Sequence, residues 1–169
     1  MGATLVYDYT FDVENRLAAV TTNNQTTTFA YDADGQRILT IQHDGVRVYT
    51  PFAEYEETVT GTTTTQRSSY YVAGQLIAAR VKTPTTDATY YAYADHLGSI
   101  VAWSWPDGSP PVIDHLARYE PFGDYRTKPA MAMNPDVSTR GFTGHQQNNT
   151  GVYGVGLIYI CLLYTSRWV

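Results

Sequence analysis

Cysteine, charge and helical periodicity are all scarce in this 169-residue sequence, and each scarcity excludes a class of protein. The single cysteine, Cys161, cannot form an intramolecular disulfide, so a disulfide scaffold is excluded. Lys and Arg number 11 against 16 Asp and Glu, a net charge of −5 without any long basic run, so nucleic acid is not an expected partner. No window sustains a 3.6-residue apolar period with caps at both ends, which argues against long helices.

Targeting and membrane signals are lacking too. The start MGATLVYDYTFD has no basic segment followed by a continuous apolar segment, and no later stretch is long and apolar enough for a membrane span. We therefore expect neither a signal peptide nor a membrane span within these residues. A fragment of a secreted protein would share this feature.

The residues that are abundant favour strands. Fifteen tyrosines, many threonines and a hydrophobic content of 43% suit pleated, half-buried surfaces, and the length suffices for one domain with a sizeable core. We therefore expect an all-β fold. Strand-like runs cover residues 4–11, 17–22, 26–31, 37–43, 46–50, 54–60, 66–72 and 75–81.

Turn chemistry separates these runs. Asp-Gly stands between two runs in DADG at residues 32–35 and in HDGV at residues 43–46, and Gly tolerates the positive φ that such turns need. VAGQ at residues 72–75 is a weaker signal of the same kind. Successive runs are therefore expected to pair as antiparallel hairpins. PAMAMNPDVST, residues 129–139, is the best candidate for a loop or linker.

Two stretches repeat at a spacing of 20 residues. FDVENRL at residues 11–17 and YDADGQRI at residues 31–38 share an aromatic residue, Asp, a short polar turn, Arg and an aliphatic residue. We interpret YVAGQLI at residues 71–77 as a decayed third copy. In such a unit the aromatic residue ends a strand and Asp can bond the backbone of the turn. One hairpin cannot bury its own apolar face, so we expect an array of stacked units.

These motifs resemble a known family. YDADGQRI is similar to the tyrosine-aspartate (YD) repeats of bacterial Rhs and wall-associated proteins, and of the teneurin and toxin-complex shells. Three further blocks, DHLGSI at residues 95–100, YEPFGDYR at 119–126 and RGFTGH at 140–145, occur in the order of the Rhs repeat-associated core domain. The motif residues are Tyr31, Asp32, Gly35, Arg37, Asp95, His96, Leu97, Gly98, Ser99, Tyr119, Pro121, Phe122, Gly123, Arg140, Gly141, Phe142, Gly144 and His145.

The resemblance implies an antiparallel hairpin array that forms part of a curved or spiralling β-shell and is truncated at the C-terminus. Residues 1–85 would be a repeat segment of the shell, residues 86–160 the start of the core domain, and residues 161–169 a non-native tail. Glu120 stands where the family usually has Asp before Pro-Phe-Gly. It keeps the carboxylate on a longer side chain, and we expect the turn to be kept.

The resemblance also implies a function. In the family the shell encloses a C-terminal polymorphic toxin and delivers it in bacterial competition, so the role of this segment would be structural, without catalysis and without a cofactor. The implied partners of the complete protein are the toxin domain, secretion machinery and an immunity protein, and the implied location is secreted or cell-surface. The alternative is an extracellular wall-associated module that adheres to carbohydrate or to a cell surface.

The end of the chain departs from the family pattern. After RGFTGH the family runs through a short polar stretch into GLIYMNARYYDP, whereas here a longer stretch leads to GLIYICLLYTSRWV. In one reading frame CLLYTS is encoded by TGT CTC TTA TAC ACA TCT, which resembles the transposon end used to prepare sequencing libraries. We interpret residues 161–169 as translated adapter and Ile160 as a hybrid codon. The alternative is a genuine hydrophobic edge strand.

Histidine and serine offer little for chemistry. The sequence around Ser99 is not G-x-S-x-G and has no strand-to-helix setting, and the histidine spacing lacks the usual pattern of a zinc site. We therefore expect a structural role, in which side chains beside Gly fix loops through local hydrogen bonds. The four histidines are His43, His96, His115 and His145.

The carboxylates fit turns better than acid-base chemistry. An acid-base pair is unique in a chain and needs two different environments, whereas Asp in a Tyr-Asp turn recurs every 20 residues. We expect these groups to stabilise turns. The carboxylates considered are Asp12, Asp32, Asp34, Asp95, Asp114 and Glu120.

The aromatic residues allow two interpretations. A sugar-binding platform is one, but adjacent tyrosines in a strand point to opposite faces, so we favour rings that brace neighbouring strands. Trp103 and Trp105 lie two apart and are expected on one face, where they would plug the lumen of a shell or cover its edge. The tyrosines in question are Tyr70, Tyr71, Tyr90, Tyr91 and Tyr93.

Overall fold

A single antiparallel meander dominates the computed structural model, which describes residues 7–111, 116–120, 125–127, 137–138, 140–144, 147–149 and 156–158. Ten strands follow one another in chain order, each paired with its sequence neighbour. They are β1 (Asp8–Phe11), β2 (Leu17–Thr22), β3 (Gln25–Tyr31), β4 (Arg37–Ile41), β5 (Arg47–Phe52), β6 (Tyr55–Thr60), β7 (Thr63–Val72), β8 (Gln75–Lys82), β9 (Asp87–Ala94) and β10 (Ile100–Trp103).

The all-β prediction is confirmed by this sheet. Each of the eight strand-like runs expected from the sequence overlaps one of the first eight strands. The sheet also continues through β9 and β10, which the sequence pattern did not delimit. The expected boundary between residues 85 and 86 falls in the turn between β8 and β9, and one sheet continues through it.

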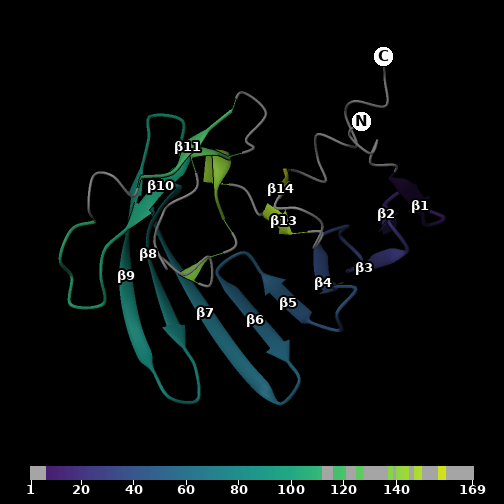
Figure 1. Cartoon of the computed structure of the whole chain (residues 1–169), viewed down its shortest axis with the longest axis horizontal. Helices are drawn as coiled ribbons and strands as arrows, with labels where there is room; N and C mark the ends of the chain where they lie inside the picture. Colours follow the sequence, from purple (N-terminus) through teal and green to yellow (C-terminus); the bar gives the residue numbers. More distant parts are fainter. Residues whose placement is uncertain are drawn as a thin grey trace.

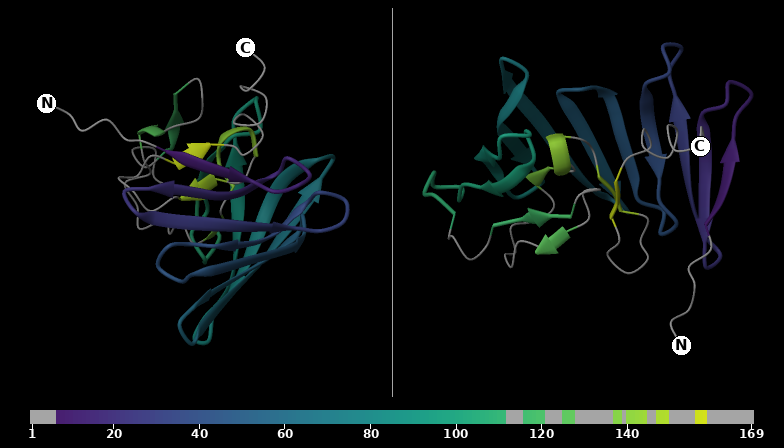
Figure 2. Two further views of the ribbon diagram at one scale, coloured as in Figure 1. Left: turned by 90° about the vertical axis from the view of Figure 1, so that its right-hand side faces the viewer. Right: turned by 90° about the horizontal axis from the view of Figure 1, so that it is seen from above.

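The sheet is curved, and the later elements lie on its concave side (Figures 1 and 2). Among the residues described after β10 are two short antiparallel pairs and one 3-10 turn. They are β11 (Arg118–Tyr119), β12 (Tyr125–Thr127), η3 (Phe142–Gly144), β13 (Gln147–Asn149) and β14 (Gly156–Ile158). Antiparallel strands that twist and curve in this way bury one face and leave the other to solvent.

Alternation along the strands decides which residues face inward. Cross-strand partners share a face, so the register places Phe29, Thr40 and Val48 in one row, and all three are buried. At the β8–β9 end the concave face packs against β10 and against Val137, a residue of the expected 129–139 loop that joins the core here. The two clusters of buried apolar residues are Leu17, Val20 and Phe29, and Leu76, Ala79, Val81, Ile100, Trp103 and Val137.

A buried ion pair also lies on the concave face. Glu56 and Arg67 are directly opposite in the β6–β7 register, and Arg67 Nη1 lies 3.0 Å from Glu56 Oε1 and 2.6 Å from Thr58 Oγ1. Both charged residues are less than a tenth exposed. Breaking a buried ion pair by removing one partner costs about 3–5 kcal/mol in comparable cases.

The two tryptophans do not share an environment, and the expectation of a common face is wrong. Trp103 is 7% exposed in the core, whereas Trp105 is 38% exposed at the start of the next loop. The bend after β10 separates them, because Trp105 begins a loop closed by its N–H donating to the Ser109 carbonyl.

Other expectations lie outside the described residues. These include the adapter interpretation of residues 161–169, Ile160, most of the 129–139 loop, Asp114 and His115. Within the part of the chain that the structure describes, no helix is long and apolar enough to cross a membrane.

Candidate functional site

Asp95 organises the first of the three core-domain blocks. Its carboxylate Oδ1 accepts hydrogen bonds from the backbone N–H groups of Leu97 (2.9 Å) and Ser99 (2.8 Å). The backbone of Asp95 closes the same loop twice, accepting from Gly98 N–H (3.0 Å) and donating to the Ser99 carbonyl (2.9 Å). Residues 95–99 therefore form a five-residue loop, held by one carboxylate and positioned between β9 and β10.

The same five-residue loop occurs in the two YD-type units. Asp12 and Asp32 each accept at Oδ1 from the N–H groups two and four residues later, at 2.8–3.0 Å. Hydrogen bonds to its carboxylate lower the pKa of Asp12, the backbone N–H of Arg16 contributing most. The strands flanking all three loops share one register irregularity, immediately before the Asp. The block DHLGSI is therefore, in geometry, a further unit of the repeat.

The fourth position of the loop requires a left-handed backbone. Gly35 and Gly98 both have φ +80°, and Asn15 takes the same place with φ +62°. Gly tolerates this region without strain, and Asn is among the residues that tolerate it best otherwise. Loops beginning at Gln42 and Trp105 close with the same backbone hydrogen bonds and also carry Gly in fourth place, but their Asp is the third residue.

Two details of the repeat alignment differ from expectation. Residues 71–77, interpreted as a decayed third copy, keep the register irregularity at Tyr71 but lack the five-residue loop, because Val72 pairs with Gln75 across a two-residue turn with positive φ at Ala73 and Gly74. The third Asp-first loop is the one at Asp95. The two arginines of the repeat are not equivalent either, since Arg16 is the fifth loop residue whereas Arg37 opens β4 and lies over the Phe29 ring at 5.3 Å.

At two places a tyrosine hydroxyl joins one unit to an earlier one. Tyr31 Oη donates to the carbonyl of Leu17 at 2.8 Å, and Leu17 is the residue directly after the first five-residue loop. Tyr119 Oη donates to the carbonyl of Ile100 at 2.5 Å, and Ile100 holds the equivalent place after the Asp95 loop. Burial raises the pKa of Tyr31 above its ordinary value.

Arg16 adds a second connection between the first two units. Its Nε donates to Asp12 Oδ2 at 2.7 Å, and its Nη1 reaches the backbone carbonyl of Asp32 at 3.3 Å. The guanidinium also lies 5.0 Å from the centre of the Tyr31 ring. One side chain therefore holds its own loop and the loop of the next unit together.

The second core block continues this pattern. Tyr119 pairs with Tyr125, and Arg118 with Thr127, which is the same register shift found at Tyr31 and Arg37. The pairing encloses residues 120–124, again five residues with Gly in fourth place in the sequence EPFGD. Glu120, the substitute for Asp, pairs with Arg126 at 2.9 Å. Pro121, Phe122 and Gly123 lie outside the described residues.

The third core block docks on the first. Thr143 N–H donates to Ser99 Oγ at 3.1 Å, and Ile100 N–H donates to the carbonyl of Gly141 at 3.0 Å. The Phe142 ring lies 5.6 Å from the ring of Tyr119. Together residues 95–100, Tyr119 and residues 140–144 form what we call the core junction. The chain therefore brings all three core blocks together on the concave side.

Arg140 connects the core junction to a part of the sheet that is distant in sequence. Its Nη1 donates to the Gly144 carbonyl at 3.1 Å, its Nη2 donates to the Ala53 carbonyl at 3.0 Å, and its guanidinium lies 5.9 Å from the centre of the Tyr71 ring. Ala53 lies between β5 and β6, 87 residues earlier in the chain. The Arg140 side chain thus joins residues 140–144 to two separate places on the sheet.

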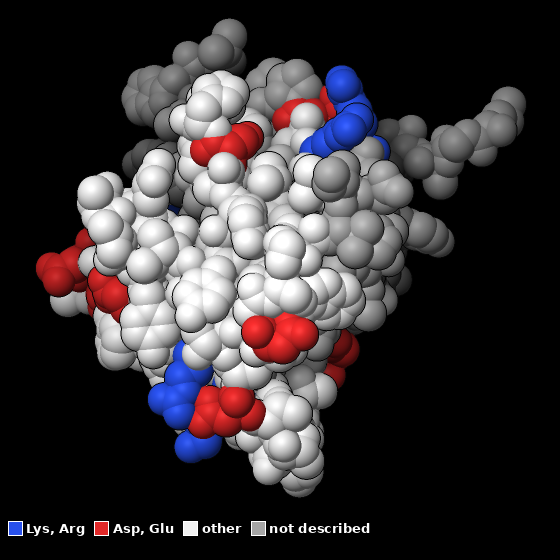
Figure 3. Space-filling view, turned by 90° about the vertical axis from the view of Figure 1, so that its left-hand side faces the viewer, with Lys and Arg blue, Asp and Glu red and all other residues white. Residues whose placement is uncertain are grey.

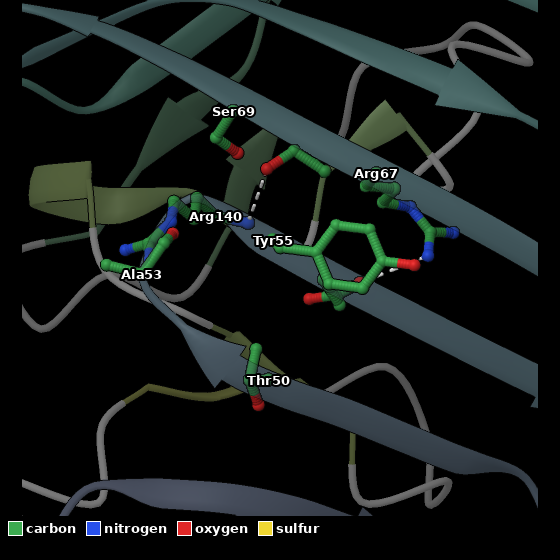
Figure 4. A pocket seen from close by; sticks show the side chains of 8 residues that line it. Thr50, Ala53, Tyr55, Arg67, Ser69 and Arg140 are labelled. Atoms are coloured by element: carbon green, nitrogen blue, oxygen red, sulfur yellow. Dashed lines mark hydrogen bonds and ion pairs between the residues drawn. The ribbon is translucent and has the colours of Figure 1, made fainter.

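A small cavity lies behind Arg140, between the core junction and the buried ion pair (Figure 4). Its volume of about 10 Å³ leaves room for at most one water molecule. A substrate pocket is far larger, on the order of 300 Å³ or more. The lining residues are Thr50, Ala53, Tyr55, Glu56, Arg67, Ser69, Ser138 and Arg140.

Ser99 and the described histidines lie in loops. Ser99 is fully buried and its Oγ accepts a backbone N–H. His96 lies within the Asp95 loop and His43 within the loop that begins at Gln42, whereas His145 lies outside the described residues. In the ranges that the structure describes, no three His, Cys, Asp or Glu residues are grouped as metal ligands would be. Sequence reasoning missed the contact between Arg140 and Ala53, since no local pattern signals it.

Comparison with known proteins supports a shell-type fold. No family model and no curated protein matches the chain. Among solved structures, it superposes with a TM-score of 0.68 on the TcdB2-TccC3-Cdc42 structure at 18% identity, and with a TM-score of 0.69 on the Photorhabdus luminescens Tc holotoxin pore carrying the TccC3 mutation D651A, also at 18% identity. Each match covers 86% of this chain but 8% of the other. The chain therefore has the fold of a small part of these much longer chains.

Proposed function

We propose that this chain is a segment of the wall of an Rhs-like β-shell, together with the junction at which the chain turns from the wall into the interior. The observation that carries the proposal is the core junction itself. Three sequence blocks meet on the concave side of a curved sheet, and Arg140 binds them to the β5–β6 turn. The likeness to toxin-complex chains supports a shell role of this kind.

We infer that the complete protein encloses a further domain. The described elements after β10 lie on the concave side of the sheet, which supports an enclosed space on that side. We infer that this domain is a toxin, that the segment itself performs no catalysis, and that the complete protein is secreted or displayed at the cell surface. Secretion machinery and an immunity protein would be the partners of the complete system.

The test uses the complete gene product, obtained by sequencing the source locus across and beyond the codons for Tyr159 and Ile160. Arg140→Ala is introduced into this product, with Arg126→Ala as the matched control, because Arg126 is 65% exposed in its side chain and pairs only at the surface with Glu120 in the described contacts. Limited proteolysis then measures how fast the downstream domain is cut.

We expect the downstream domain of the unmodified product to resist protease, and Arg140→Ala to accelerate its cleavage by several fold while Arg126→Ala does not. A downstream domain cut at the rate of an unprotected protein would refute enclosure. A locus that continues instead into wall-anchoring or lectin modules would refute the toxin role and favour adhesion.

A further inference from the structure

Three of the five-residue loops carry Asp followed by Gly in third and fourth place. These Asp-Gly pairs are residues 34–35, 44–45 and 107–108, and all of them are exposed. In each loop the Gly has a φ between +80° and +84°, and its N–H donates to the carbonyl of the first loop residue. Exposure and backbone conformation therefore do not distinguish the three pairs.

The hydrogen bonds of the Asp carboxylates do distinguish them. Asp44 Oδ1 accepts from the N–H of Val46 at 3.1 Å. Asp107 Oδ1 accepts from the N–H of Ser109 at 2.9 Å and from the Ser109 hydroxyl at 2.6 Å, and these bonds, that of the hydroxyl above all, lower the pKa of Asp107. In both loops the carboxylate of the third residue is therefore held by the fifth residue.

Asp32 prevents this arrangement in the loop at residues 32–36. Its Oδ1 accepts from the N–H of Gln36 at 2.8 Å, and Gln36 is the fifth residue of this loop. The same Oδ1 accepts from the N–H of Asp34 at 3.0 Å. The donor that would hold the third residue is therefore already taken by the first. Within the part of the chain that the structure describes, the Asp34 carboxylate accepts no hydrogen bond.

No cation holds the Asp34 carboxylate in the contacts that the structure describes. On the face of the molecule that Figure 3 shows, some acidic groups lie against basic ones and others stand alone. None of the ion pairs described for this chain includes Asp34. The Gly35 N–H also lies 3.2 Å from the carbonyl oxygen that accepts it, against 2.9 Å for the corresponding N–H groups of Gly45 and Gly108. Residues 34–35 are therefore the least restrained of the three pairs.

An Asp carboxyl group that is not held can turn back onto the backbone nitrogen of the next residue. Gly in that place leaves the nitrogen accessible, because it has no side chain. The nitrogen forms a bond to Cγ of Asp, and the carboxyl OH leaves with the amide proton as water, which closes a succinimide ring. Water then adds to the former main-chain carbonyl carbon and breaks its bond to the nitrogen. The product is isoaspartate, and the net reaction neither gains nor loses atoms.

We propose that Asp34 is a site of spontaneous isomerisation to isoaspartate, and that hydrogen bonds to the fifth loop residue protect Asp44 and Asp107. In the product, Cβ becomes part of the main chain, so the five-residue loop is lengthened between Asp32 and Gly35. The product also carries a free α-carboxylate, which is the group that isoaspartate-specific methyltransferases recognise. The proposal rests on hydrogen bonds within single loops and is independent of the shell role.

The test incubates the 169-residue chain at mildly acidic pH, where more of the carboxyl groups carry the proton that leaves with the OH. Trypsin then releases peptides 17–37, 38–47 and 83–118, so each Asp-Gly pair lies in a different peptide. Mass spectrometry with electron-transfer fragmentation measures the fraction of isoaspartate in each peptide over time. A parallel incubation in concentrated urea gives the rates without the folded loops.

Two reciprocal variants isolate the contribution of the hydrogen bond. Asp32→Gln gives this loop the residue that begins the loop at residues 42–46, and it leaves the Gln36 N–H to the Asp34 carboxylate. Gln42→Asp makes the opposite exchange, so that the new carboxylate competes with Asp44 for the Val46 N–H. Neither variant alters an Asp-Gly pair itself, and the pair at residues 107–108 is the internal control in both. Circular dichroism establishes that each variant is folded.

We expect isoaspartate to form at Asp34 several fold faster than at Asp44 or Asp107 in the folded chain, and the three rates to converge in urea. Asp32→Gln should slow the reaction at Asp34 several fold, and Gln42→Asp should accelerate it at Asp44, while Asp107 is unaffected. Equal rates at the three sites of the folded chain would overturn the proposal. So would the same order of rates in urea, or an unchanged rate at the exchanged loop of either folded variant. The shell role would stand in each of these cases.

Discussion

At the scale of single residues, one loop position decides whether the repeat geometry can form. Gly98 has φ +80°, and the space where a Cβ would stand is open, so the restriction comes from the backbone alone. The first unit solves the same problem with Asn15 at φ +62°. Ala and Asn at position 98 would both add a side chain to the loop, but they differ in how well they tolerate the left-handed backbone.

Gly98→Ala should lower the free energy of unfolding by about 1 kcal/mol, because Ala is strained in the left-handed region. Gly98→Asn should lose clearly less, since Asn tolerates this conformation. Urea denaturation followed by fluorescence measures both. Equal losses in the two variants would show that the left-handed backbone is not what the position requires.

At the scale of the elements, the tyrosine hydroxyls explain how one hairpin unit is held to the next. Tyr31 and Tyr119 donate to the carbonyls of Leu17 and Ile100, which occupy equivalent places after two different loops. If the two hydrogen bonds are equivalent, removal of either hydroxyl should destabilise the fold by a similar amount.

Tyr31→Phe and Tyr119→Phe should each destabilise the fold by about 1 kcal/mol, the usual net value of one intramolecular hydrogen bond. The expected fall in melting temperature is about 2–4 °C for a domain of this size. Tyr49→Phe on the convex face serves as control and should leave the melting temperature unchanged. A strong effect in one tyrosine variant alone would argue against equivalence of the units.

The elements also mark how far the sequence could predict the structure. Strand positions follow from local alternation and turn residues. The Asp-first turns follow from hydrogen bonds within five residues, so both could be predicted from FDVENRL and DADG. The equivalence of DHLGS with those turns was missed, because Ala94 replaces the aromatic residue that precedes Asp in the repeat. The contacts of Arg140 with Ala53 and of Thr143 with Ser99 span 87 and 44 residues, and no local pattern encodes them.

At the scale of the whole molecule, the sheet is a series of hairpins, and carboxylates stabilise it at several positions. Asp12 bonds the backbone of its loop, Asp87 pairs with Arg80 across β8 and β9, and Asp107 binds Ser109 in the loop after β10. These interactions lower the pKa of all three groups, chiefly through the Arg16 N–H, the Arg80 side chain and the Ser109 hydroxyl, respectively. Protonation of these carboxylates in acid should therefore destabilise the sheet at several positions over the same pH range.

A carboxyl whose pKa is lower in the folded chain than in the unfolded chain stabilises the fold above its unfolded value, about pH 4, and this contribution is lost as the pH falls through the folded value. The melting temperature should therefore be insensitive to these groups between about pH 6 and 8 and should drop below about pH 4. Asp12→Asn keeps an oxygen acceptor for the loop but does not titrate, so its melting temperature should start lower at neutral pH and fall less in acid. Asp8→Asn, at an exposed carboxylate of β1, is the control. If Asp12→Asn lost as much melting temperature between pH 7 and pH 3 as the unmodified chain, the carboxylate of Asp12 would not contribute to the acid sensitivity.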